Sequence, residues 1–280
     1  MKAIKIVTDS AADLPQEILD EYDIHRVPLT LYIDGETYRD AVDISPEEFL
    51  VRMKNAKELP KTSQPAAGSF VELYNELGKD GSEILSIHMT GKMSGTIRSA
   101  ESAAEMSEAN VTVCDSCYIS KAQAYQVIEA AKMAREGKTM EEILQRLEEI
   151  RSQTKLYIVV DTLENLIKGG RIGKAKGFIG SLLNIKPIAN LDIGELTPVT
   201  KVRSHAQVVK FLANQIAEEV KNKEIIKISL AHAGGLELAN KLRDKLTELT
   251  GYDQIEIDTT TPIISTHAGP GAVGLMYWAK

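Results

Sequence analysis

The stretch EILSIHMTGKMSGTIRSAESAAEM, residues 83–106, passes from a strand through a turn into a helix. Residues 83–90 form a short apolar run, which is typical of a buried strand. Gly91 and Gly95 permit a sharp turn, and residues 96–106 have the composition of an amphipathic helix. Because strands and helices alternate in this way through the first half of the chain, we predict a parallel sheet with helices on both faces.

The second half of the chain predicts a different sheet. Residues 186–192 and 195–202 have the pattern of two paired strands joined by a short turn. The polar segment 151–155 marks the predicted boundary between the halves. We therefore expect an α/β fold of two α/β domains with a cleft between them. Residues 1–152 would contain a mainly parallel sheet and residues 153–280 a mixed sheet.

The composition excludes several classes of protein. The chain has 280 residues, of which 43% are hydrophobic and 26% charged, and its formal net charge is -7. A general nucleic-acid binder would carry a basic surface, so we expect no nucleic-acid partner. No apolar run approaches the roughly 20 residues of a membrane span, so we expect no stable membrane insertion. With two cysteines and no recognisable signal peptide, the chain is predicted to be cytoplasmic.

Small polar residues occur where several predicted strands end. Ligands in open parallel sheets bind beyond the carboxyl ends of the strands, so these residues predict a site for a carboxylate or phosphate. Any one of them alone is more often a helix N-cap, and only their convergence favours a site. The segments are Thr8-Asp9-Ser10, Thr90-Gly91, Asp115-Ser116 and, in a loop before a proline, Thr62-Ser63.

Ser94 raises the alternative of a serine hydrolase. A nucleophile elbow has the pattern Gly-x-Ser-x-Gly, whereas this segment is Gly91-Lys-Met-Ser94-Gly95. The spacing is therefore wrong by one residue on each side. A general base is available in principle, because three histidines lie at or near predicted strand ends, namely His88, His232 and His267.

Cys114 and Cys117 raise the alternative of a redox protein. A Cys-x-x-Cys pair where a strand meets a helix resembles a redox motif. The chain has no second pair with which to form a zinc site, and we expect no metal. An incidental pair of small residues is the simpler interpretation.

Five segments together resemble the DegV family of bacterial fatty-acid-binding proteins, the lipid-carrying subunits of fatty acid kinase. They follow one another in the order expected for the family and span nearly the whole chain. Each motif alone would be weak, and the set is specific. The segments are IVTDSAADLP (6–15), PKTSQPAAGSF (60–70), HMTGKMSGTIRSA (88–100), DTLENLIKGGRI (161–172) and THAGPGAVG (266–274).

The resemblance implies that one long-chain fatty acid is buried between the two domains. It implies that the hydroxyls of Thr62, Ser63 and Ser94 hold the carboxylate of the acid. It also implies that Arg203 and His267 lie close to this head group. A separate ATP-dependent kinase would phosphorylate the bound acid to an acyl phosphate. The four residues after Arg203 differ from the more basic stretch that is usual in the family.

The same resemblance implies that this chain has no catalytic residue of its own and uses no cofactor. The fatty acid is its ligand, and the kinase catalytic subunit is its partner. Ser94 would then hold the ligand and not attack it. Arg171 follows a short predicted helix and two glycines. We predict that it lies on the surface that meets the kinase.

Overall fold

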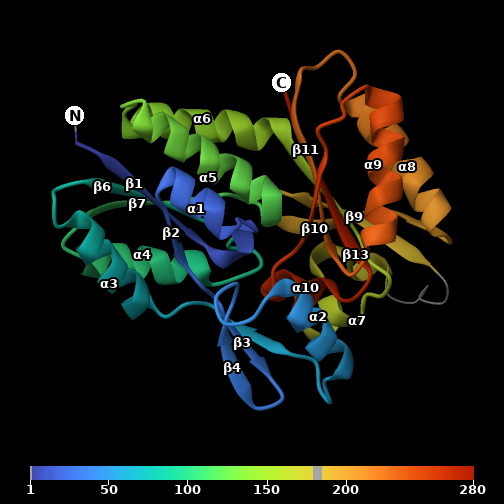
Figure 1. Ribbon diagram of the computed structural model, residues 1–280, viewed down its shortest axis with the longest axis horizontal. Helices are drawn as coiled ribbons and strands as arrows, with labels where there is room; N and C mark the ends of the chain where they lie inside the picture. Colours follow the sequence, from blue (N-terminus) through green and yellow to red (C-terminus); the bar gives the residue numbers. More distant parts are fainter. Residues whose placement is uncertain (1, 179–184) are drawn as a thin grey trace.

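The computed structural model describes residues 2–178 and 185–280, which form two sheet-based halves and a smaller sheet (Figure 1). The strands are β1 (Ile4–Asp9), β2 (Ile24–Val27), β3 (Thr30–Ile33), β4 (Glu36–Arg39), β5 (Lys61–Ser63), β6 (Glu83–His88), β7 (Asn110–Asp115), β8 (Thr154–Val159), β9 (Lys186–Asp192), β10 (Glu195–Val202), β11 (Ile225–Ala233), β12 (Glu256–Thr259) and β13 (Ala272–Ala279).

The α-helices are α1 (Gln16–Tyr22), α2 (Pro46–Asn55), α3 (Ala67–Gly78), α4 (Thr96–Met106), α5 (Ser120–Arg135), α6 (Met140–Gln153), α7 (Glu164–Lys168), α8 (His205–Glu219), α9 (Leu236–Thr250) and α10 (Pro262–Ala268). Two 3₁₀ segments are η1 (Ser10–Ala12) and η2 (Gly173–Phe178). In the described ranges, none of the helices is both long and apolar enough to cross a bilayer.

The N-terminal half contains the predicted parallel sheet. Its four strands have the order β2-β1-β6-β7, and every pair is parallel. Alternate residues of each strand point to opposite faces of the sheet. Val7 and Ile84 pack in a cluster with Phe70 of α3, whereas Ile6 and Leu85 belong to the large cluster that includes α5. Helices therefore cover both faces, as the sequence predicted.

The C-terminal half contains a mixed six-stranded sheet. Its order is β10-β9-β8-β13-β11-β12, and only β11 and β12 are parallel. The predicted pair of strands at 186–202 is confirmed as the antiparallel β9–β10 hairpin. Tyr157, Val159 and Leu275 pack in one cluster with α8 and α9. The opposite face of this sheet is turned toward the N-terminal half.

A small antiparallel sheet, β4-β3-β5, lies at the lower end of the molecule in Figure 1. Asp34 and Gly35, which connect β3 to β4, both have positive φ (48° and 86°), as a two-residue hairpin turn requires. The sequence did not predict β5, because a strand of three residues has no apolar alternation. Its pairing with β3 places Thr62 opposite Leu31.

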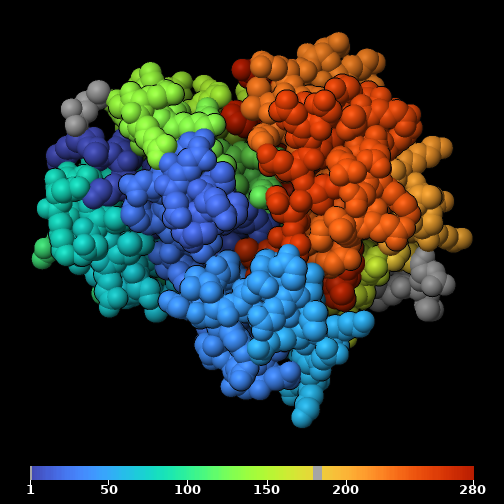
Figure 2. Space-filling model, in the orientation of Figure 1, coloured from blue at the N-terminus to red at the C-terminus, as the bar shows by residue number. Residues whose placement is uncertain are grey.

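The two halves share a continuous hydrophobic cluster. The predicted boundary between residues 152 and 153 falls where α6 ends and β8 begins. The largest cluster nevertheless combines Ile6 and Leu85 with Leu156 and Met276 from the other half. In the space-filling view the two halves meet along a seam (Figure 2). The assignment of residues 1–152 and 153–280 as separate domains stays a prediction.

Helix α10, which the sequence analysis missed, is anchored by two carboxyl groups from the N-terminal half. Asp13 Oδ1 accepts a hydrogen bond from the N–H of Thr261 (2.8 Å), and Asp13 Oδ2 accepts one from the hydroxyl of Thr260 (2.7 Å). Asp40 Oδ1 accepts one from the N–H of Ile263 (3.1 Å). Because the first N–H groups of a helix have no partner within it, these bonds fix where α10 begins.

Asp40 predicts a pH-dependent stability. Burial raises its pKa to about 7, and the neighbouring Asp13 adds to this effect, whereas Arg26 opposes it. Above the ordinary value of 3.8 and below about 7, the folded protein keeps a proton that the unfolded chain has lost. The free energy of unfolding therefore falls as pH rises through this interval.

Asp40→Asn retains an acceptor oxygen without the charge. We expect its free energy of unfolding, relative to that of wild type, to increase from pH 5 to pH 8. The gain should be about 1–4 kcal/mol, at roughly 1.4 kcal/mol per pKa unit. Urea unfolding at several pH values measures it. Asp43→Asn is the control, because Arg39 lowers the pKa of Asp43 and the gain should not occur. A pH-independent difference between Asp40→Asn and wild type would contradict the prediction.

Candidate functional site

A cavity lies between the two halves, at the carboxyl ends of the parallel strands. It encloses about 840 Å³ of space free of atoms, its open mouth included. Leu29 follows β2, Met89 follows β6 and Ile119 follows β7, and all three line it. The cavity therefore occupies the place where open parallel sheets bind ligands.

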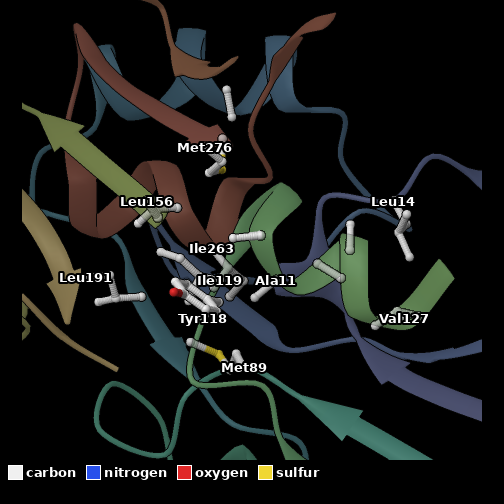
Figure 3. Close-up of a cluster of buried hydrophobic side chains, with 14 of the residues drawn as sticks. Ala11, Leu14, Met89, Tyr118, Ile119, Val127, Leu156, Leu191, Ile263 and Met276 are labelled. Atoms are coloured by element: carbon white, nitrogen blue, oxygen red, sulfur yellow. The ribbon is translucent and has the colours of Figure 1, made fainter. Parts of the chain in front are cut away.

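The mixed sheet supplies the opposite wall. Residues two apart on a strand share one face of a sheet, and the lining follows this rule. Leu156 and Ile158 of β8 line the cavity, as do Gly274 and Met276 of β13. Figure 3 shows Leu156 and Met276 in a cluster with Met89, Ile119 and Ile263 from other elements.

The polar lining is confined to a few side chains. Ser120 and Thr260 both donate their hydroxyl hydrogens to Asp13, so these hydrogens are not available to a ligand in the cavity. We call the other four the polar end, because Thr62 contacts His267 and Arg171 contacts the carbonyl of Met93, the residue before Ser94. The polar end consists of Thr62, Ser94, Arg171 and His267.

Thr62 and His267 are joined across the halves of the chain. Thr62 Oγ1 on β5 lies 2.8 Å from Nε2 of His267 on α10. Burial, with the nearby charge of Arg171 as a second cause, lowers the pKa of His267 to about 4. The imidazole is therefore neutral at neutral pH. Its Nδ1 is buried and has no hydrogen-bond partner among the described residues.

Arg171 supplies the positive charge of the polar end. Its Nε donates to the carbonyl of Met93 (3.0 Å) and its Nη1 donates to the carbonyl of Gly169. Burial lowers the pKa of Arg171, but a guanidinium stays charged at neutral pH. The structure places Arg171 in the cavity wall, where it also borders a surface hollow with Lys92. Its predicted contact with the kinase stays a prediction.

Ser94 lies in the turn that precedes α4. Its Oγ accepts a hydrogen bond from the N–H of Thr96 (3.2 Å) and lies 2.8 Å from the hydroxyl of Thr96. Within the part of the chain that the structure describes, no histidine bonds to Ser94. The arrangement lacks the base that a nucleophilic serine requires, and it suits a hydroxyl that holds a ligand.

Two of the predicted binding residues do not reach the polar end. Neighbouring strand residues point to opposite sides, so when Thr62 faces the cavity, Ser63 faces away and bonds to the carbonyl of Gln64. Arg203 follows β10 and borders a surface hollow formed by β10 and α8. Since α8 packs on the far face of the mixed sheet, Arg203 is held apart from the cavity.

Two of the polar residues at the strand ends, Asp9 and Asp115, support the loop that carries Ser94. Asp9 Oδ2 accepts the N–H of Met89 (2.8 Å), and Asp115 Oδ2 accepts the N–H of Gly91 (3.1 Å). A side chain at Gly91 would approach Asp115 to 3.3 Å, so glycine suits this close contact. Both carboxylates therefore accept hydrogen bonds from backbone N–H groups, which need a partner inside the protein, and are not available to the ligand that the sequence predicted.

A Ser-His-Asp series occurs in the parallel sheet without access to a substrate. Ser86 Oγ lies 2.7 Å from His88 Nε2, and His88 Nδ1 lies 3.0 Å from Asp9 Oδ2. All three residues are 0% exposed, in contact with neither solvent nor the cavity. The series is therefore part of the core and gives no support to a hydrolase.

The two cysteines give no support to redox chemistry. Both are free. Burial raises the pKa of the Cys114 thiol and that of the Cys117 thiol. Since the thiolate is the reactive species, both are less reactive than an ordinary cysteine at neutral pH.

Gly169 is a site residue that the sequence analysis mentioned only as one of two glycines before Arg171. A Cβ atom at this position would lie closer than 3.0 Å to Nδ1 of His267 and to the carbonyl of Asn165. Because Gly169 has no side chain, the end of α7 can pack directly against the imidazole of His267 on α10. The signal in the sequence is the Gly-Gly pair, and only the fold shows which ring it accommodates.

We expect Gly169→Ala to displace His267 and to cost about 1–3 kcal/mol, as overpacking of a tight site does. Urea unfolding measures the cost, and NMR titration of His267 should show its pKa rising from about 4 toward the ordinary 6.5. Gly177→Ala is the matched control, because a Cβ there meets nothing within 4 Å. A wild-type titration of His267 in Gly169→Ala would contradict the proposed contact.

Comparisons with known proteins agree with this architecture. A family model described as an uncharacterised protein of the DegV family matches residues 3–280. A DegV domain-containing protein of Listeria monocytogenes is 50% identical over 279 residues, 99% of each chain.

Two solved structures match over nearly the whole chain. A fatty-acid-binding DegV family protein from Thermus thermophilus has 31% identity and a TM-score of 0.93, and the match covers 99% of this chain and 100% of that one. A DegV family protein from Eubacterium eligens, loaded with heptadecanoic acid, has 25% identity and a TM-score of 0.85, with 99% and 100% covered. By sequence and by fold, this chain belongs to the DegV family.

Proposed function

We propose that the protein binds one long-chain fatty acid in the cavity between its halves. The observation that carries this proposal is an apolar cavity whose polar end combines two hydroxyls and an imidazole with the single positive charge of Arg171. That combination matches an aliphatic chain with one terminal carboxylate. The fatty acids bound by the related structures from Thermus thermophilus and Eubacterium eligens support the same assignment.

The acyl chain provides most of the binding free energy. Burying about 14 methylenes at ~0.8 kcal/mol each gives on the order of 11 kcal/mol before entropic costs. An unpaired carboxylate in the same cavity would cancel much of this gain, because burying a charge is costly. Hydrogen bonds to the ionised group offset that cost, since they are stronger than those between neutral groups.

The polar end has donors available for a carboxylate. Arg171 uses Nε and Nη1 within the protein, and its Nη2 makes no hydrogen bond with the described residues. Ser94 accepts from the N–H of Thr96 and lies 2.8 Å from the Thr96 hydroxyl. When Thr96 is the donor of that second bond, the hydroxyl hydrogen of Ser94 can be donated to the ligand. Thr62 and neutral His267 carry two polar hydrogens, one on the hydroxyl and one on the ring. One of them forms the bond between the two side chains, and the other can be donated to the ligand. Ser63 and Arg203 are not part of this proposal.

The finer function that we propose is presentation of the carboxylate to a separate ATP-dependent kinase, which forms the acyl phosphate. The polar end lies next to the surface, because Arg171 borders both the cavity and a hollow with Lys92 and Lys176. Two exposed lysines beside the head group suit an incoming phosphate. The chain itself needs no cofactor for this role, which belongs in the cytoplasm, where ATP is present.

Native mass spectrometry of the purified protein tests the binding directly. We expect an adduct with the mass of a long-chain fatty acid, which organic extraction removes and added fatty acid restores. A protein that carries no such adduct and binds no fatty acid on addition would refute the proposed function.

The hydroxyls of the polar end predict a graded loss of affinity. Thr62→Ala and Ser94→Ala should each weaken fatty-acid binding by about 1.5–3 kcal/mol, the range for hydrogen bonds to charged groups. The double variant should lose more than either, although not additively, since both contact one ligand. Ser63→Ala is the matched control and should bind as wild type does. Titration with a fluorescent fatty acid measures all four.

Arg171 distinguishes a pocket residue from a docking residue. Because it lines the cavity, Arg171→Met should lower fatty-acid affinity and kinase-dependent formation of acyl phosphate together. Lys92→Met, on the surface hollow alone, should slow phosphorylation while fatty-acid affinity is retained. Unchanged fatty-acid affinity in Arg171→Met would move this residue back to the partner-facing surface.

A further inference from the structure

Gly274 is an anomaly in the central strand of the mixed sheet. It pairs with Ile158 of β8 and with Ala231 of β11, in the interior of β13. Every other residue from Ala272 to Ala279 is buried, and only Gly274 keeps some exposure. Glycine within a strand weakens it, and it often marks a place where a ligand approaches the backbone closely.

The protein itself does not require a glycine at this position. Its φ is not in the left-handed region, and an added Cβ would lie 3.8 Å from the carbonyl oxygen of Ala231 and from Met276 Cε, which is ordinary contact. Gly271 is different, because its φ is 83° and a Cβ would collide with Asp161. The missing side chain of Gly274 therefore leaves space that belongs to the cavity.

The neighbouring residues extend this space into a trough. Ala272 pairs with Ala233, and Gly274 with Ala231, so two successive rows across β13 and β11 carry at most a methyl group. The next row contains Met276, which is fully buried, and Leu156 beside it. From Ala272 to Met276 the trough is about 13 Å long at roughly 3.3 Å per residue.

The direction of the trough follows from the chain. Helix α10, which carries His267 of the polar end, finishes at Ala268, and β13 begins four residues later at Ala272. The small side chains thus begin near the polar end, and the large ones, Leu156 and Met276, follow farther along β13. Figure 3 shows these two side chains together in the hydrophobic cluster.

We propose that Gly274 and Met276 determine the length of acyl chain that the protein accepts. Gly274 leaves room for the middle of the chain to pass over the sheet, and Met276 closes the far end of the trough. This inference rests on the proposed fatty-acid binding, and it assigns chain-length specificity to two residues with opposite effects.

Two substitutions test it in opposite directions. Gly274→Val places a branched side chain in the trough and should lower the affinity for stearic acid relative to lauric acid at least about tenfold. Met276→Ala opens the far end and should raise the affinity for behenic acid relative to stearic acid by a similar factor. Competition of the purified acids, read by native mass spectrometry of the complexes, gives both ratios.

Controls separate a change in specificity from a loss of fold. Gly274→Ala is the milder variant and should shift the ratio in the same direction by less. Gly68→Ala, exposed at the start of α3 with nothing within 4 Å of the added Cβ, should leave the ratio unchanged. Thermal unfolding of each variant shows whether it is folded.

The outcomes distinguish this inference from the proposed function. Wild-type ratios in folded Gly274→Ala and in Met276→Ala would overturn the assignment of chain length while leaving fatty-acid binding intact. A parallel loss of affinity for every acid, with unchanged ratios, would also overturn it. Failure of the wild-type protein to bind any of the acids would refute the proposed function instead.

Discussion

The attachment of α10 to two buried carboxyl groups is the constraint on which the site depends. Asp13 and Asp40 belong to the first forty residues, and they accept hydrogen bonds from residues more than 220 positions later in the chain. These bonds bring α10 against the N-terminal half, and α10 in turn places His267 beside Thr62. Without this attachment, the cavity would lose the lining that α10 supplies, including His267, one of the four residues of the polar end.

The electrostatics of the polar end suit a single bound anion. Arg171 carries the charge, and burial beside it keeps His267 neutral at neutral pH. A second buried cation would add a desolvation cost without a second anion to pair with it. The neutral imidazole instead adds directional hydrogen bonding with Thr62. Under the proposed function, this end of the cavity would hold the terminal carboxylate and the aliphatic walls would contact the acyl chain.

Two pairs of residues show what the sequence alone could not predict. They are Thr62 with Ser63, and Arg171 with Arg203. Each pair contains residues that look equivalent as donors, yet only Thr62 and Arg171 line the cavity. The alternation of side chains along β5 decides the first pair. The second is decided by the face of the mixed sheet on which each loop emerges, because α8 covers the face opposite the cavity. The residues of a motif do not indicate to which side of a strand a side chain points or on which face of a sheet a loop lies.

The sequence by itself determined the alternation of strands and helices, the β9–β10 pair and the family, because apolar periodicity, turn residues and short motifs are local signals. It also named Thr62, Ser94 and His267, all of which line the cavity. Only the tertiary structure decided the short elements β5 and α10, the use of Asp9 and Asp115 as backbone supports, and the trough over Gly274. These features depend on partners that are distant in the chain, and no local pattern records which buried groups will meet when the two sheets pack together.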